Sequence, residues 1–145
     1  MLGAHEIYRE MTQIEQRYRE FRDLFHRFKE LAITGLTADD CPVKSITFEN
    51  QDEENYFYGH FAGKCVRFSF SMERDKEGIF RGDVKCNLVD PSTKERGFEV
   101  GNFSFNGRGN TKLKLPGDGD EINISHDAHA AYIALHMLYA ALGKQ

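Results

Sequence analysis

The side chains closest to a nucleophile arrangement are Cys65 and His60, which lie five residues apart. The residue pattern places them on neighbouring strands and on the same face of a predicted sheet, where an imidazole could reach the thiol. The sequence contains no G-x-S-x-G, H-E-x-x-H or C-x-x-C motif. We therefore expect a non-catalytic protein, and we keep an enzyme that uses His60 and Cys65 as one hypothesis.

The other histidines do not predict a metal site. His129 and His136 lie seven residues apart, which is about 11 Å along a helix, so they could not share one ion. A set of His126 and His129 with the distant His60 or Cys65 is the remaining possibility. The run Asp118-Gly-Asp120-Glu121 lacks the spacing of a calcium loop, and the turn Asn106–Asn110 precedes a strand rather than the helix of a phosphate loop. We expect no metal and no cofactor.

A second group of side chains predicts a binding surface. If Phe57 and Phe61 point into the core, then alternating residues on the same and following strands face outward. Aromatic and cationic side chains interleaved on an open sheet can hold a protein partner or stack nucleic-acid bases. The net charge of −4 favours a protein and makes nucleic acid unlikely. The predicted binding residues are Tyr56, Tyr58, His60, Arg67, Arg81 and Arg108.

The same residues also allow a different class of function. A pocket between the sheet and the helices, lined by Tyr56, Tyr58, Arg67, Arg81 and Arg108, could hold a small ligand or a nucleotide. A solvated polar face without function is the third interpretation of this pattern.

An aromatic stripe predicts a long helix over residues 4–33. Apolar side chains recur at alternating steps of four and three, at Ile7, Met11, Ile14, Tyr18, Phe21, Phe25, Phe28 and Ala32. Such a helix is about 45 Å long, as long as the expected diameter of about 40 Å for the whole domain. We expect its bulky rings to cover a sheet, and we take its excess length as a reason to expect a partner. The helix should end at Thr34-Gly35-Leu36.

Between residues 43 and 125 the apolar period changes from 3.6 to 2, which predicts strands separated by short turns. Six or seven strands in such succession predict an antiparallel meander. Cys65 falls on the polar face and Cys86 on the apolar face of a hairpin, so we expect them to stay apart. A β-bulge at Gly101-Asn102 would keep Phe98, Val100, Phe103 and Phe105 on the core side.

A second helix is predicted at about 126–142. It is apolar nearly all round, which is typical of a helix buried on more than one side. We expect it to supply the contact between subunits of a homo-oligomer, through Tyr132, His136 and Tyr139.

The length of the chain fits one domain over residues 1–145, and the predicted helices and strands make it an α+β domain. Of the 145 residues 40% are hydrophobic and 29% charged, and three cysteines cannot form a paired disulfide framework. We expect no signal peptide, no membrane span and a cytoplasmic protein. An acidic α+β protein with long terminal helices resembles secretion chaperones, toxin-immunity proteins and phage-encoded inhibitors in general shape. The sequence thus predicts a non-catalytic protein-binding module of accessory, inhibitor, immunity or chaperone type that acts as a homo-oligomer.

Overall fold

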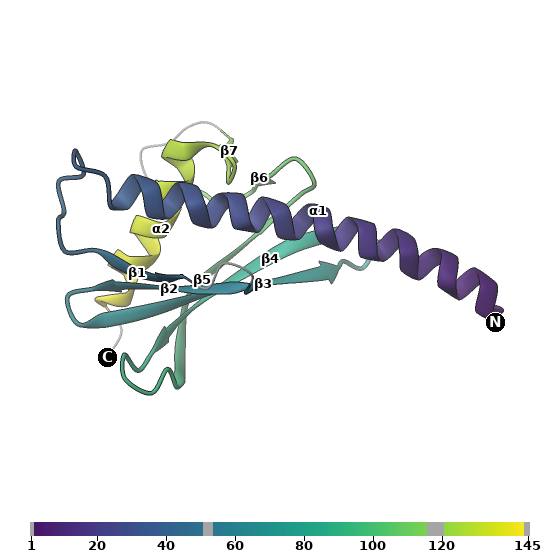
Figure 1. The fold of residues 1–145 in the computed structure, drawn as a ribbon, viewed down its shortest axis with the longest axis horizontal. Helices are drawn as coiled ribbons and strands as arrows, with labels where there is room; N and C mark the ends of the chain where they lie inside the picture. The colour runs from purple at the N-terminus through teal and green to yellow at the C-terminus, as the bar shows by residue number, and fades with distance from the viewer. Residues whose placement is uncertain (1, 51–53, 116–120, 144–145) are drawn as a thin grey trace.

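The computed structural model describes residues 2–50, 54–115 and 121–143. In these residues the chain forms a helix, a seven-stranded sheet and a second helix (Figure 1). The order is α1 (Ala4–Leu36), β1 (Thr47–Asn50), β2 (Tyr56–Phe61), β3 (Lys64–Arg74), β4 (Phe80–Val89), β5 (Arg96–Phe105), β6 (Asn110–Thr111), β7 (Ile122–Asn123) and α2 (Asp127–Ala141). The predicted α+β class is confirmed.

The sheet is an antiparallel meander. Each strand pairs with the next one along the chain, in the order β1 to β7. Residues 43–46, which we predicted to begin the first strand, precede it. The outermost strands are short, with four residues in β1 and two in β7.

A layer of phenylalanine rings joins α1 to the sheet. Phe21, Phe25 and Phe28 are fully buried on the helix and meet rings from three strands, β2, β3 and β5. Phe25 stacks on Phe70 of β3 with 5.4 Å between ring centroids, and Phe28 meets Phe103 of β5 edge to face at 5.5 Å. Phe57 and Phe68, opposite each other on β2 and β3, stack at 4.6 Å. The stripe therefore covers the sheet, as its aromatic residue types predicted.

The junction between the helices depends on a glycine. We expected Gly35 to end α1, but the helix continues to Leu36 and its last carbonyl groups are met by Thr37, whose hydroxyl donates to the Ile33 oxygen at 2.6 Å. A Cβ added at Gly35 would lie 2.8 Å from the Cβ of Ala131 on α2. Gly35 thus permits a close helix crossing instead of a chain reversal. Both helices pack on the same inner face of the sheet, because Leu138 of α2 lies against Gly59 of β2.

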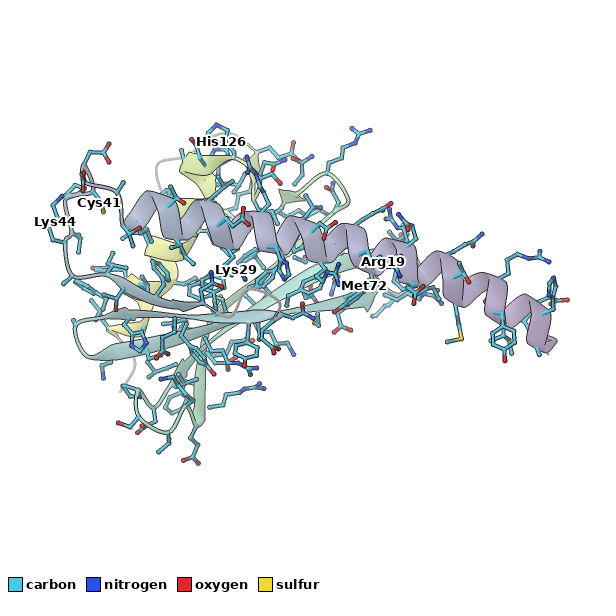
Figure 2. The ribbon with its side chains drawn as sticks, in the orientation of Figure 1. Arg19, Lys29, Cys41, Lys44, Met72 and His126 are labelled. Atoms are coloured by element: carbon cyan, nitrogen blue, oxygen red, sulfur yellow. The ribbon has the colours of Figure 1, made fainter. Side chains whose placement is uncertain are left out.

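The first part of α1 extends past the sheet. In Figure 1 the purple end of the helix projects into open space, and in Figure 2 it continues well beyond Met72 near the end of β3. The stripe residues of this part are exposed, with 43% of Ile7 and 59% of Met11 accessible. One domain therefore covers only the later part of the stripe.

Irregularities in β5 curl the sheet. Cys86 pairs with Gly101 and Asn87 with Glu99, so Val100 is an extra residue, and a second shift separates the partners of Asn87 and Val89. The predicted bulge is present one residue before the expected position. Phe103 and Phe105 are buried, but Phe98 is 64% exposed because the second shift turns the first half of β5 away from the core. In Figure 1 the β4–β5 hairpin descends on the side of the sheet opposite α1.

We predict that Gly82→Ala destabilises the protein by about 2 kcal/mol. Gly82 pairs with Phe105, and an added Cβ would lie 2.2 Å from Phe105 Cζ, so the ring would have to leave its place beneath α1. Urea denaturation measures the loss. Gly3→Ala is the matched control, since nothing lies within 4 Å of a Cβ there. An unchanged midpoint for Gly82→Ala would contradict this account of the packing.

Candidate binding surface

The outer face of the sheet carries four of the predicted binding residues together. On β2 the side chains of Tyr56, Tyr58 and His60 alternate with the buried Phe57, so they point away from both helices. In the register with β3, Tyr58 lies opposite Arg67 and His60 lies opposite Cys65. The alternation and the register thus bring Tyr56, Tyr58, His60 and Arg67 to one place.

These side chains stack on one another. The Arg67 guanidinium carbon lies 4.7 Å from the centroid of the Tyr56 ring, and Tyr56 meets Tyr58 edge to face at 5.7 Å. The Lys94 ammonium lies 5.3 Å from the centroid of the Tyr58 ring. Cations over aromatic faces are attracted by the ring quadrupole, which holds both partners in defined orientations. The surface is therefore organised by contacts within the chain itself.

Two members of this surface were missed by the sequence reasoning, Glu49 of β1 and Lys94 of the β4–β5 turn. Glu49 Oε2 lies 3.1 Å from Lys94 Nζ and 3.3 Å from His60 Nε2. We call Glu49, Tyr56, Tyr58, His60, Arg67 and Lys94 the outer cluster. The approach of Lys94 to Glu49 and Tyr58 depends on the curl of the sheet, which brings the β4–β5 turn next to β1 and β2. The alternation of residues along a strand does not predict that curl.

The turn that presents Lys94 is organised by Asp90. The Asp90 carboxylate accepts hydrogen bonds from the backbone N–H groups of Ser92 and Thr93, each at 2.9 Å. These two bonds lower the pKa of Asp90, because they favour its charged form. Lys94 itself has a φ of +63°, an uncommon backbone conformation, and its ammonium also donates to the Pro91 oxygen at 2.7 Å. The position of the ammonium is thus set by the fold of the turn.

The outer cluster is locally cationic on an acidic chain. The hydrogen bond from Lys94, followed by that from His60, lowers the pKa of Glu49 below its ordinary value. Glu49 is therefore ionised at neutral pH, and the two cations Arg67 and Lys94 outnumber this one carboxylate.

Arg67 is incompletely satisfied. In the described part of the chain no carboxylate forms an ion pair with it, and its Nε is buried without a hydrogen-bond partner. Buried polar atoms are nearly always hydrogen-bonded, so such an atom calls for an explanation. Arg67 is a cation held in place by Tyr56 and left without its own counter-ion among the described residues.

The two remaining predicted arginines lie elsewhere. Arg81 shares the outer face but stands at the start of β4, where it pairs with Asp83 at 3.3 Å. Arg108 lies in the β5–β6 turn, where its backbone N–H donates to Asn106 Oδ1 at 2.9 Å. Tyr56, Tyr58 and Arg67 face away from both helices, so they do not line a space between the sheet and the helices.

The predicted oligomer residues lie on α2. Tyr132 and His136 are half-buried, whereas Tyr139 is 72% exposed. Leu135 and Leu142 beside Tyr139 are each more than a third exposed, so an apolar strip remains on this helix. Another side of α2 is buried against α1 and the sheet, through Ala130, Ile133, Ala134, Met137, Leu138 and Ala141. Whether the strip contacts a second subunit stays a prediction.

The geometry does not support a Cys65 nucleophile. Cys65 Sγ lies 3.7 Å from His60 Nε2, but Glu49 approaches the same nitrogen, whereas an acid that orients a catalytic histidine needs the opposite one. Burial raises the pKa of the Cys65 thiol to about 11. The thiol is thus protonated at neutral pH, which is the unreactive form.

No set of three His, Cys, Asp or Glu side chains in the described ranges could hold a metal ion. His126 and His129 stack on each other at 4.4 Å on the helical side of the sheet, whereas His60 and Cys65 belong to the outer face. Neither described helix is long and apolar enough to cross a membrane.

Comparison of the chain with protein-family models, with curated proteins and with solved structures finds no match. The functional argument therefore depends on the surfaces themselves.

We predict an acid-dependent contribution from Glu49. Because its pKa is lowered in the folded state, its contacts stabilise the protein above its ordinary pKa of 4.5, and this contribution is lost as the pH falls through the lowered value. Urea unfolding between pH 7 and pH 3 measures this contribution. The free energy of unfolding of wild type should exceed that of Glu49→Gln at neutral pH, and the difference should vanish in acid. A difference that grows as the pH falls would contradict the assignment.

We predict that the three thiols differ in reactivity. Cys41 is partly exposed, whereas Cys65 and Cys86 are buried and burial raises the pKa of both. An aromatic disulfide reagent should therefore titrate one fast thiol in the native protein and all three after unfolding. The fast phase should disappear in Cys41→Ser, and a second fast thiol in wild type would argue against a buried Cys65.

Proposed function

We propose that this chain is a non-catalytic protein-binding module that acts as a homo-oligomer and recognises an acidic partner protein through the outer cluster. The observation that carries the proposal is Arg67, stacked on Tyr56 and without a carboxylate partner among the described residues. A guanidinium fixed in one plane is suited to a bidentate bond with a carboxylate, and little entropy remains to be lost on binding.

The neighbours of Arg67 support a protein partner. Tyrosine and arginine are the residue types most enriched among those that dominate interface energies. Tyr58 and Lys94 extend the surface next to Arg67. Pairing with β3 holds the backbone of Tyr58 in place, and the hydrogen-bonded β4–β5 turn holds that of Lys94. The excess of cations favours a partner that presents Asp or Glu side chains, because complementary charge speeds encounter and sets orientation.

The free thiols bear on the compartment in which the protein works, and the exposed apolar side chains bear on self-association. Three free cysteines suit a reducing compartment such as the cytoplasm. The apolar surface left exposed on both helices is the reason to propose a homo-oligomer.

A binding experiment tests the outer cluster. The tagged protein is used to capture a partner from its host, and the partner is then produced pure and titrated against variants by calorimetry. We expect Arg67→Glu to weaken binding at least tenfold, because it replaces the unpaired cation by a charge that repels the partner. Tyr58→Ala should have a smaller effect in the same direction.

Arg108→Glu is the matched control, since it makes the same charge change in an exposed turn away from the outer cluster. Equal losses for Arg67→Glu and Arg108→Glu would indicate a general charge effect and contradict a specific site. Undiminished binding by Arg67→Glu would overturn the proposal.

A further inference from the structure

The projecting part of α1 leaves several large apolar side chains exposed. Ile7, Tyr8 and Met11 are exposed at 43, 70 and 59%, and Ile14 is half-buried at the edge of the sheet. Ile7, Met11, Ile14 and Tyr18 follow the alternating four-three spacing of a helix–helix seam. Unlike the phenylalanines further along, Ile7, Met11 and Ile14 are side chains of the size that fits between two paired helices.

A hollow beside this segment leaves room for a neighbour. It has a volume of about 530 Å³ and lies between Ile14 and Arg17 of α1 and Arg74 and Phe80 at the hairpin of β3 and β4. Its apolar floor is formed by Ile14 and Phe80, and a second hollow lies next to Met11 and Ile14. The end of a second helix therefore has room to pack where α1 extends past the sheet.

The charges that flank the seam indicate which neighbour fits. Glu10 and Arg17 lie on one side of the seam, seven residues apart, and Glu15 and Arg22 lie on the other. In a parallel pair of identical helices Glu10 would face Glu15 of the second copy, and Arg17 would face its Arg22. Both contacts bring like charges together, so the segment is unsuited to a parallel dimer.

An antiparallel pair centred between Thr12 and Gln13 gives the opposite result. Met11 then packs against Ile14 of the second copy. Glu10 faces Arg17 of the second copy, and the two-fold axis repeats this ion pair. Glu10 forms no ion pair in the described residues. Arg17 forms one ion pair there, an exposed contact with Glu20 at 3.1 Å that is easily exchanged, and its guanidinium carbon lies 5.0 Å from the centroid of the Phe21 ring.

We propose that the projecting segment of α1 docks on the same segment of a second copy, in antiparallel orientation, with Glu10 bound to Arg17 of that copy. This proposal deepens the homo-oligomer part of the proposed function by naming its surface, and it is independent of partner binding by the outer cluster. The contact covers about two heptads per copy, so we expect a dissociation constant on the order of 10 µM.

Sedimentation velocity from 1 to 200 µM tests the proposal on the whole protein. Wild type should change from monomer to dimer across this range. The double variant Ile7→Glu/Met11→Glu should remain monomeric, and because both side chains are exposed its circular dichroism and melting curve should match wild type. Tyr139→Glu, on the exposed strip of α2, is the control and should dimerise normally.

Charge exchange tests the orientation. Glu10→Arg and Arg17→Glu each turn two attractive contacts per dimer into repulsive ones and should weaken the dimer roughly tenfold. The double variant Glu10→Arg/Arg17→Glu restores both pairs and should return close to wild-type affinity. A dimer that Glu10→Arg strengthens has another register, and the proposed pairing is then wrong.

The remaining outcomes separate this inference from the proposed function. A wild-type dimer that Tyr139→Glu disrupts and Ile7→Glu/Met11→Glu leaves intact would overturn the inference and keep the homo-oligomer. A wild type that stays monomeric to 200 µM would overturn both the inference and the homo-oligomer, whereas the outer cluster is decided by Arg67→Glu alone.

Discussion

The stacking of Phe21, Phe25 and Phe28 on the inner rings of the sheet is the contact on which the rest of the structure depends. It is formed by fully buried side chains, and burying an aromatic ring is among the largest favourable contributions that one residue can make. The contact orients α1 along the sheet, and α2 then packs beside α1 at the close crossing of Gly35 and Ala131. Since both helices occupy the inner face, the outer face stays open for the outer cluster. The same contact anchors a helix longer than the sheet, so the first turns must project.

Most of the architecture could be predicted because it follows from local periodicity. The four-three spacing of the stripe and the strict alternation in β3 and β4 each correspond to one element, and the short turns allow only neighbouring strands to pair. Gly35 was misinterpreted because a glycine that ends a helix and a glycine that admits a neighbouring helix look the same in sequence. The exposure of Phe98 was missed for a related reason, since two irregularities in one strand shift its residues twice and alternation cannot locate both.

The candidate site was predictable only for two strands that are adjacent in the sequence. Tyr56, Tyr58, His60 and Arg67 come from two paired strands, so their shared face follows from alternation and register. Glu49 and Lys94 were not found because Lys94 approaches β1 and β2 only through the curl of the whole sheet. Arg108 was grouped with them by residue type, although it lies in a turn that does not reach this face. Long-range curvature therefore decides which charges meet, and it is the property that local patterns describe least well.

The short outer strands limit one route by which copies of a sheet protein can associate. An exposed strand edge can recruit further strands without limit, but four residues in β1 and two in β7 offer too few backbone groups to template such growth. Growth of the sheet by strand addition to β1 or β7 is therefore disfavoured. The two-fold contact proposed for α1 would use the same surface of both copies, so an assembly formed by it would close at two.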